Sequence, residues 1–89
     1  MEDFKNFVSK YIGAIIGIIV GNEDAVPPMN ELLHAYGDCI IGRMGIPHRE
    51  RGINIISIAI EASAERINAL TGKLGRIEGI SAKATFSKV

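Results

Sequence analysis

The chain has 89 residues, of which 47% are hydrophobic and 22% charged, and its ten basic residues balance ten acidic ones. This length allows one domain with one core, and zero net charge removes the long-range attraction that nucleic acids and anionic membranes need in a protein partner. So high an apolar share leaves hydrophobic surface beyond the core, which predicts self-association into a homodimer or tetramer.

The single cysteine and the first residues indicate the compartment. Cys39 has no partner for an internal disulfide, and Glu2, Asp3 and Lys5 interrupt the stretch where a secretory signal would be apolar. The longest apolar run, residues 11–20, is about half the roughly 20 residues of a membrane-spanning helix. We therefore expect a cytoplasmic protein with no membrane partner.

The first predicted element is a short helix in residues 1–11, which we treat as a segment separate from the domain formed by residues 12–89. Phe4, Phe7, Val8 and Tyr11 recur at the i, i+3, i+4, i+7 spacing of an amphipathic helix. A helix this short is marginal alone, so the segment must dock on the domain or on a partner.

Residues 12–20 predict a central strand because both of its faces are apolar. A helix follows from Pro27 and Pro28, which suit a first helical turn, and Gly37 is a plausible stop. Its apolar stripe consists of Met29, Leu32, Leu33 and Tyr36. Residues 39–45 then predict a second strand.

The second half of the chain repeats this order. Residues 46–52 combine proline, charge and glycine as an exposed hairpin loop does, and residues 53–60 form another strand that is apolar on both faces. Ser63 can cap a second helix, and residues 80–86 alternate between apolar and polar, as in an edge strand. The stripe of this helix consists of Ile67, Leu70, Leu74 and Ile77.

The resulting order βαββαβ predicts an α+β, ferredoxin-like fold with a four-stranded antiparallel sheet in the order 4-1-3-2 and two helices on one face. The opposite face is then uncovered. Four isoleucines of the central strands should lie on it and form the oligomer interface: Ile15, Ile19, Ile53 and Ile55.

Three segments of the chain resemble a known family. They are Asn30–Leu33 (NELL), Arg43–Glu50 (RMGIPHRE) and Leu70–Ile80 (LTGKLGRIEGI). On these segments the chain resembles the small regulators of the iron-only hydrogenase system, which look like the ACT domain and the C-terminal domain of the nickel-responsive repressor. The resemblance covers nearly the whole fold.

This resemblance implies a non-enzymatic, ferredoxin-like oligomer of regulatory or assembly type, linked to hydrogenase maturation or expression. ACT-like modules bind small effectors near the turn after the first strand, which here is Gly21, Asn22 and Glu23. The glycine would expose backbone amides beside a helix N-terminus, although Glu23 and Asp24 equally suit a plain turn and the helix dipole. Only eleven residues precede the first strand, in place of the repressor's ribbon-helix-helix, so we expect no direct binding to nucleic acid.

Two further sites follow from side-chain chemistry. Arg43 and Arg49 could bind an anionic effector, since guanidinium groups match carboxylates and phosphates, or could be an ordinary solvated loop. Cys39, His34 and His48 could hold a metal. Cys39 and His48 lie at opposite ends of the second strand, about 25 to 30 Å apart, so a metal site would need two subunits.

Catalysis is not expected from this sequence. No nucleophile, base and orienting group occur in a recognisable arrangement, and no Cys-x-x-Cys pair is present. No cofactor can be assigned. The alternative to a regulatory or assembly domain is thus a metal-responsive domain that uses Cys39 with His34 or His48 across an interface.

Overall fold

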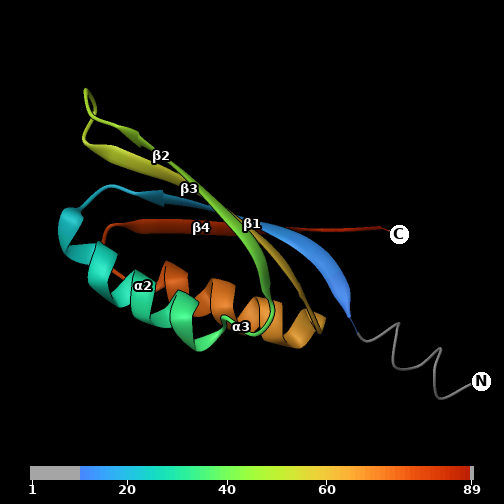
Figure 1. Cartoon of the computed structure of the whole chain (residues 1–89). Helices are drawn as coiled ribbons and strands as arrows, with labels where there is room; N and C mark the ends of the chain where they lie inside the picture. The colour runs from blue at the N-terminus through green and yellow to red at the C-terminus, as the bar shows by residue number, and fades with distance from the viewer. Residues whose placement is uncertain (1–10, 89) are drawn as a thin grey trace, which may run out of the picture.

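The computed structural model describes residues 11–88, and Figure 1 shows a twisted sheet with both helices on one of its faces. The sheet order is β2-β3-β1-β4, with every neighbouring pair antiparallel, which confirms the predicted ferredoxin-like α+β fold. The predicted segment 1–11 lies outside the described residues except for Tyr11. The elements are β1 (Ile12–Val20), the 3₁₀ turn η1 (Glu23–Ala25), α2 (Val26–Ala35), β2 (Ile40–His48), β3 (Ile53–Ala62), α3 (Ala64–Gly75) and β4 (Ile80–Phe86).

The core lies between the helices and the face of the sheet that they cover. Ile16 of β1 pairs with Ile58 of β3 and with Ala84 of β4, and both isoleucines are fully buried. The predicted helix stripes supply the other side, with Ile67, Leu70 and Leu74 of α3 having no exposed surface. The remaining buried members are Ala14, Ile18, Val20, Ala25, Met29, Leu33, Tyr36, Ile56, Ile60 and Ala62.

Two capping side chains determine where the helical segments begin, and a glycine allows the close approach of the chain at the turn after β1. Ser63 caps α3 as predicted, because its hydroxyl accepts a hydrogen bond from the amide of Arg66 at 3.2 Å. Asn22 accepts similarly from the amide of Asp24 at 3.0 Å and starts η1, which leads into α2. Gly79 has a φ of 90°, and a Cβ there would come 2.7 Å from the Cβ of Asn22, so only glycine fits beside this turn.

Strand β2 extends three residues beyond the predicted end at Gly45. Residues 46–48 were expected in the hairpin loop, but Ile46, Pro47 and His48 pair with β3, and only residues 49–52 turn. Pro47 is tolerated because β2 is an edge strand, where the missing N–H can face away from its neighbour. A bulge between Ile40 and Gly42 also shifts the register of this strand.

The face of the sheet opposite the helices is called the open face below. Register and alternation place on it Ile15, Gly17 and Ile19 of β1, Ile53, Ile55, Ser57 and Ala59 of β3, Met44, Ile46 and His48 of β2, and Ser81, Lys83 and Thr85 of β4. Both helices of the described residues lie on the other side of the sheet in Figure 1. As the sequence predicted, this face is uncovered within residues 11–88.

Candidate functional site

The open face carries a continuous apolar patch across three strands. Ile46 pairs with Ile55, and Ile55 pairs with Ile19, so three isoleucines lie in one row from β2 to β1. Ile15 and Met44 extend the patch along the strands. These five side chains are 45% to 64% exposed, whereas Ile53 at the end of β3 is partly buried.

The patch stops at β4. On that strand the positions that share the open face are Ser81, Lys83 and Thr85, which pair with Ile19, Gly17 and Ile15. A polar rim on one side of an apolar centre is the usual composition of a protein interface. The open face therefore resembles a protein interface both in its apolar centre and in its polar rim.

A first pocket, called the turn–hairpin pocket below, lies between the turn after β1 and the tip of the β2–β3 hairpin. Its volume is about 310 Å³, and it brings together Glu23 and Arg49, two of the predicted effector residues. His48 and Ile53 line the same pocket and also lie on the open face. The pocket thus borders the apolar patch.

The other effector residues predicted at this turn have structural partners. The amide of Gly21 donates to the carbonyl of Gly79 at 2.8 Å, and the side chain of Asn22 holds the amide of Asp24. The amide of Gly21 and the Oδ1 of Asn22 are thus used by the turn itself. The prediction of an effector here therefore depends on the side chains of Glu23 and Arg49.

Arg43 lies elsewhere, in a groove between α2 and β2 that is called the α2–β2 groove below. One part has a volume of about 450 Å³ and is lined by Asn30, Leu33, His34, Gly37, Ile40, Arg43 and Ile58. The other, of about 250 Å³, is lined by Val26, Met29, Arg43, Gly45, Ile46, Pro47, Asn54 and Ile56. Arg43 belongs to both parts.

A third pocket, called the thiol pocket below, surrounds Cys39 between the end of α2 and the start of α3. Its volume is about 350 Å³, and its polar lining includes Asp38, Glu61 and Arg66. The thiol of Cys39 donates to the carbonyl oxygen of Tyr36 at 3.2 Å. Burial raises the pKa of Cys39, although the guanidinium of Arg66 acts in the opposite direction.

The three candidate metal ligands line three different pockets. His34 lines the α2–β2 groove, Cys39 the thiol pocket and His48 the turn–hairpin pocket. Within residues 11–88 no three His, Cys, Asp or Glu side chains lie close enough together to hold a metal ion. A site made from these residues would need a second chain, as the sequence already indicated.

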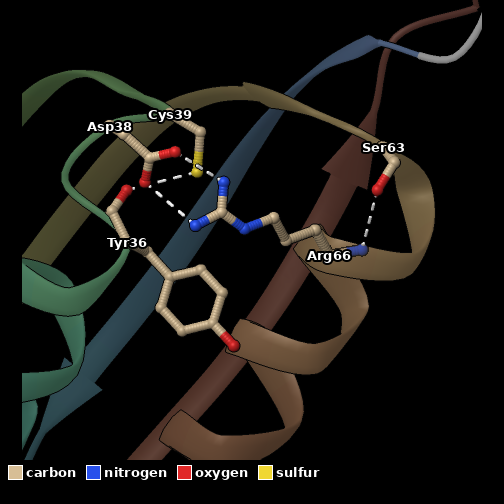
Figure 2. Close-up of polar contacts among 5 residues, drawn as sticks. All are labelled: Tyr36, Asp38, Cys39, Ser63 and Arg66. Carbon is tan, nitrogen blue, oxygen red and sulfur yellow. Dashed lines mark hydrogen bonds and ion pairs between the residues drawn. The ribbon is translucent and has the colours of Figure 1, made fainter.

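A cluster of side chains that the sequence did not single out joins the two helices (Figure 2). The guanidinium of Arg66 donates to both carboxylate oxygens of Asp38, at 2.7 and 2.9 Å, and lies 5.1 Å from the centre of the Tyr36 ring. Lys73 of α3 donates to the hydroxyl of Tyr36 at 3.0 Å. These contacts hold the end of α2 against α3.

Comparison with known proteins gives a family as well as a fold. Residues 12–84 match the TM1266-like family model, described as "Iron-only hydrogenase system regulator, putative". The uncharacterized protein TM1266 from Thermotoga maritima is 37% identical, has a TM-score of 0.84, and is covered over 99% of its length by 88% of this chain. A formyltetrahydrofolate deformylase from Pseudomonas putida shares the fold alone, since it is only 11% identical to this chain. Its TM-score is 0.62, and the match covers 82% of this chain and 28% of the deformylase chain.

Curated relatives resemble the chain over 72 residues. Proteins named "Putative nickel-responsive regulator" from Saccharolobus solfataricus and Saccharolobus islandicus are 32% and 31% identical to it over 81% of its length. The chain spans only about half, 53%, of these relatives. Separately, none of the helices within residues 11–88 is long and apolar enough to span a membrane.

Proposed function

This chain belongs to the family of iron-only hydrogenase system regulators, and on that premise we propose that it is a non-enzymatic regulatory or assembly domain that works as a homo-oligomer. The observation that carries the proposal is the apolar patch on the open face, where Ile15, Ile19 and Ile55 are about half exposed. A contiguous patch of this kind with a polar rim is a mark of an interaction site.

The pattern of β2 supports burial of this face in an assembly. Before the bulge, Ile40 faces the helices, but after it Met44 and Ile46 lie on the open face, whereas Arg43, Gly45 and Pro47 lie on the side of the helices. A solvated open face would call for the opposite arrangement, with the apolar residues toward the helices. Met44 and Ile46 are instead directed at the face that no element within residues 11–88 covers.

The energy available is sufficient for association. Burying roughly 400 Å² of apolar surface on each copy at about 25 cal/mol per Å² contributes on the order of 10 kcal/mol per copy. Bringing two copies together costs about 4 to 15 kcal/mol in lost freedom. The open face is therefore large enough to support a dimer.

Light scattering coupled to size-exclusion chromatography tests the proposal. We expect wild type to form a dimer or tetramer at micromolar concentration, and Ile55→Glu to dissociate it because a carboxylate would then be buried in the middle of the isoleucine row. Ser81→Glu is the matched control, since it adds the same charge to the same face but on its polar rim. A monomeric wild type, or equal dissociation by both variants, would contradict the proposal.

An effector in the turn–hairpin pocket is a second candidate, favoured by the placement of Glu23 and Arg49 in one cavity. Opposite charges in one pocket suit a zwitterion, and a partner covering the open face would border the ligand because His48 and Ile53 belong to both surfaces. We expect a free amino acid to raise the melting temperature of wild type. Glu23→Gln and Arg49→Gln should each abolish that increase while leaving the oligomer intact.

The alternative of a metal-responsive domain draws on the names of the nickel-responsive relatives. Since His34, Cys39 and His48 line separate pockets, this function requires ligands from two chains. Equilibrium dialysis of untagged protein against Ni²⁺ tests it. Stoichiometric binding that is lost in Cys39→Ala and in the dissociated Ile55→Glu variant would favour the metal site, and absence of binding would remove it.

A further inference from the structure

We propose that the α2–β2 groove binds a small monocarboxylate with an apolar body, held by Arg43. The groove borders the turn–hairpin pocket, with which it shares Pro47 and Asn54, and Ile46 belongs both to the groove and to the open face, but Arg43 lines neither of those two surfaces. Its two parts, of about 450 and 250 Å³, meet at Arg43 and together fall in the size range of small-ligand sites. The proposal does not depend on the function proposed above.

The groove lies where α2 packs beside α3 and residues 41–48 of β2 are exposed. The contacts of Asp38 with Arg66 and of Tyr36 with Lys73 hold the end of α2 on the side of α3. Figure 1 shows both helices below the sheet and the tip of the β2–β3 hairpin rising away from them. The side of β2 that faces the helices is therefore open to a ligand.

The walls of the groove select an apolar body. Buried core residues, Ile58 and Leu33 in one part and Ile56 and Met29 in the other, reach its lining. Gly45 on β2 and Gly37 after α2 have no side chains to fill it. A methylene chain laid against these surfaces would leave water for an apolar environment.

The charges of the groove select a carboxylate. Neither part of its lining, within the residues that the structure describes, contains Asp or Glu, whereas the turn–hairpin pocket contains Glu23 and the thiol pocket contains Asp38 and Glu61. In the same described part of the chain, the side chain of Arg43 has no hydrogen bond or ion pair. One unpaired guanidinium beside an apolar surface matches one carboxylate bidentately, and the side chains of Asn30 and His34 lie along the same wall.

A titration followed by amide chemical shifts tests the proposal, with sodium hexanoate and its uncharged isostere hexanamide as probes. We expect hexanoate to shift the amides of Gly37, Arg43 and Gly45, and to bind about tenfold more tightly than hexanamide, because a hydrogen bond to a charged partner is worth about that factor. In Arg43→Gln the ratio of the two affinities, hexanoate to hexanamide, should fall to about one.

Two further variants separate this site from general effects. Arg51→Gln removes an arginine from the hairpin turn that lines neither the groove nor the turn–hairpin pocket, and should keep the tenfold preference. Gly45→Ala narrows the groove and should weaken both probes, and it should fold because a Cβ at this position meets Ile56 at an ordinary 3.6 Å.

Several results would overturn the proposal. They are an unchanged preference for hexanoate in Arg43→Gln, an equal loss in Arg51→Gln, and shifts that gather on the open face or around Arg49. If a second copy of the chain occupies the groove, hexanoate would shift these amides in the dissociated Ile55→Glu variant but not in the oligomer. That result would also reject the carboxylate as the natural occupant.

Discussion

Arg66 and Asp38 form a two-pronged ion pair between residues that are 28 positions apart in the sequence, with nitrogen–oxygen distances of 2.7 and 2.9 Å (Figure 2). The backbone of Arg66 is also held, because Arg66 lies in the first turn of α3 and its amide donates to the hydroxyl of Ser63. The pair thereby ties the loop after α2 to the start of α3, and α2 takes the position that leaves the groove beside β2.

The ion pair predicts a pH-dependent contribution to stability. The hydrogen bonds from Arg66 hold the pKa of Asp38 below its usual range. The folded state therefore binds the proton more weakly than the unfolded chain, so the contribution is present above about pH 4 and is lost as the pH falls through the lowered pKa of Asp38.

Urea unfolding of wild type and Asp38→Asn at pH 6 and pH 3 measures this contribution. We expect the variant to be less stable at pH 6, by a small amount because both side chains are exposed to solvent, and the difference to shrink at pH 3. Glu65→Gln, at the neighbouring exposed position in α3, is the control. An equal difference at the two pH values would show that the carboxylate charge of Asp38 does not contribute.

The reactivity of Cys39 should be low near neutral pH. Burial raises the pKa of its thiol, so little of the nucleophilic thiolate is present at pH 7. The rate of alkylation by iodoacetamide should rise with pH and reach its midpoint at a higher pH than in the urea-unfolded chain. A midpoint at or below that of the unfolded chain would contradict this reading of the thiol pocket.

Gly79 and Gly72 should respond in opposite directions to the same substitution. Gly79→Ala would place a methyl group 2.7 Å from the Cβ of Asn22 on a backbone with φ of 90°, which should cost about 1 to 3 kcal/mol of the free energy of unfolding. Gly72→Ala lies within α3 with no atom from outside its own helical turn within 4 Å of the new Cβ, and should add about 0.4 to 1 kcal/mol. Chemical denaturation of both variants measures whether the free energy of unfolding falls for Gly79→Ala and rises for Gly72→Ala.

The sequence predicted the fold well because the signals for its elements are local. The apolar runs of β1 and β3, the cap at Ser63 and the alternation in β4 each depend on residues close together in the chain, and together they determine the order of the strands. The end of β2 was placed too early because Pro47 and the charges after it are typical of loops. Only the position of β2 at the edge of the sheet explains why Pro47 is accommodated there.

The sites were predictable to a smaller extent because they depend on contacts between distant segments. Ile15, Ile19 and Ile55 were assigned to the open face, but Met44 was missed since the bulge between Ile40 and Gly42 resets the register of β2. Ile46 was missed because it was assigned to the hairpin loop. Arg43 and Arg49 were assigned together as neighbours in sequence. The strand between them places their side chains in different cavities.

Lys83 should limit how far the open face associates. It occupies the middle of the polar row of β4, opposite Gly17, where an apolar residue would extend the patch to the second edge of the sheet. Charged residues on edge strands are a common means of preventing continued association, and Lys83→Ile would remove this one. We expect the variant to form larger assemblies or to precipitate at concentrations where wild type keeps a single oligomeric size.

Static light scattering over a concentration series measures the effect of Lys83. Lys83→Ser is the matched control, since it removes the charge without adding apolar surface and resembles the flanking Ser81. If Lys83→Ser associates as strongly as Lys83→Ile, the charge rather than the hydrophobicity of the row sets the limit. If neither variant grows beyond the wild-type size, the boundary of the assembly lies elsewhere than at β4, and the open face closes by its geometry alone.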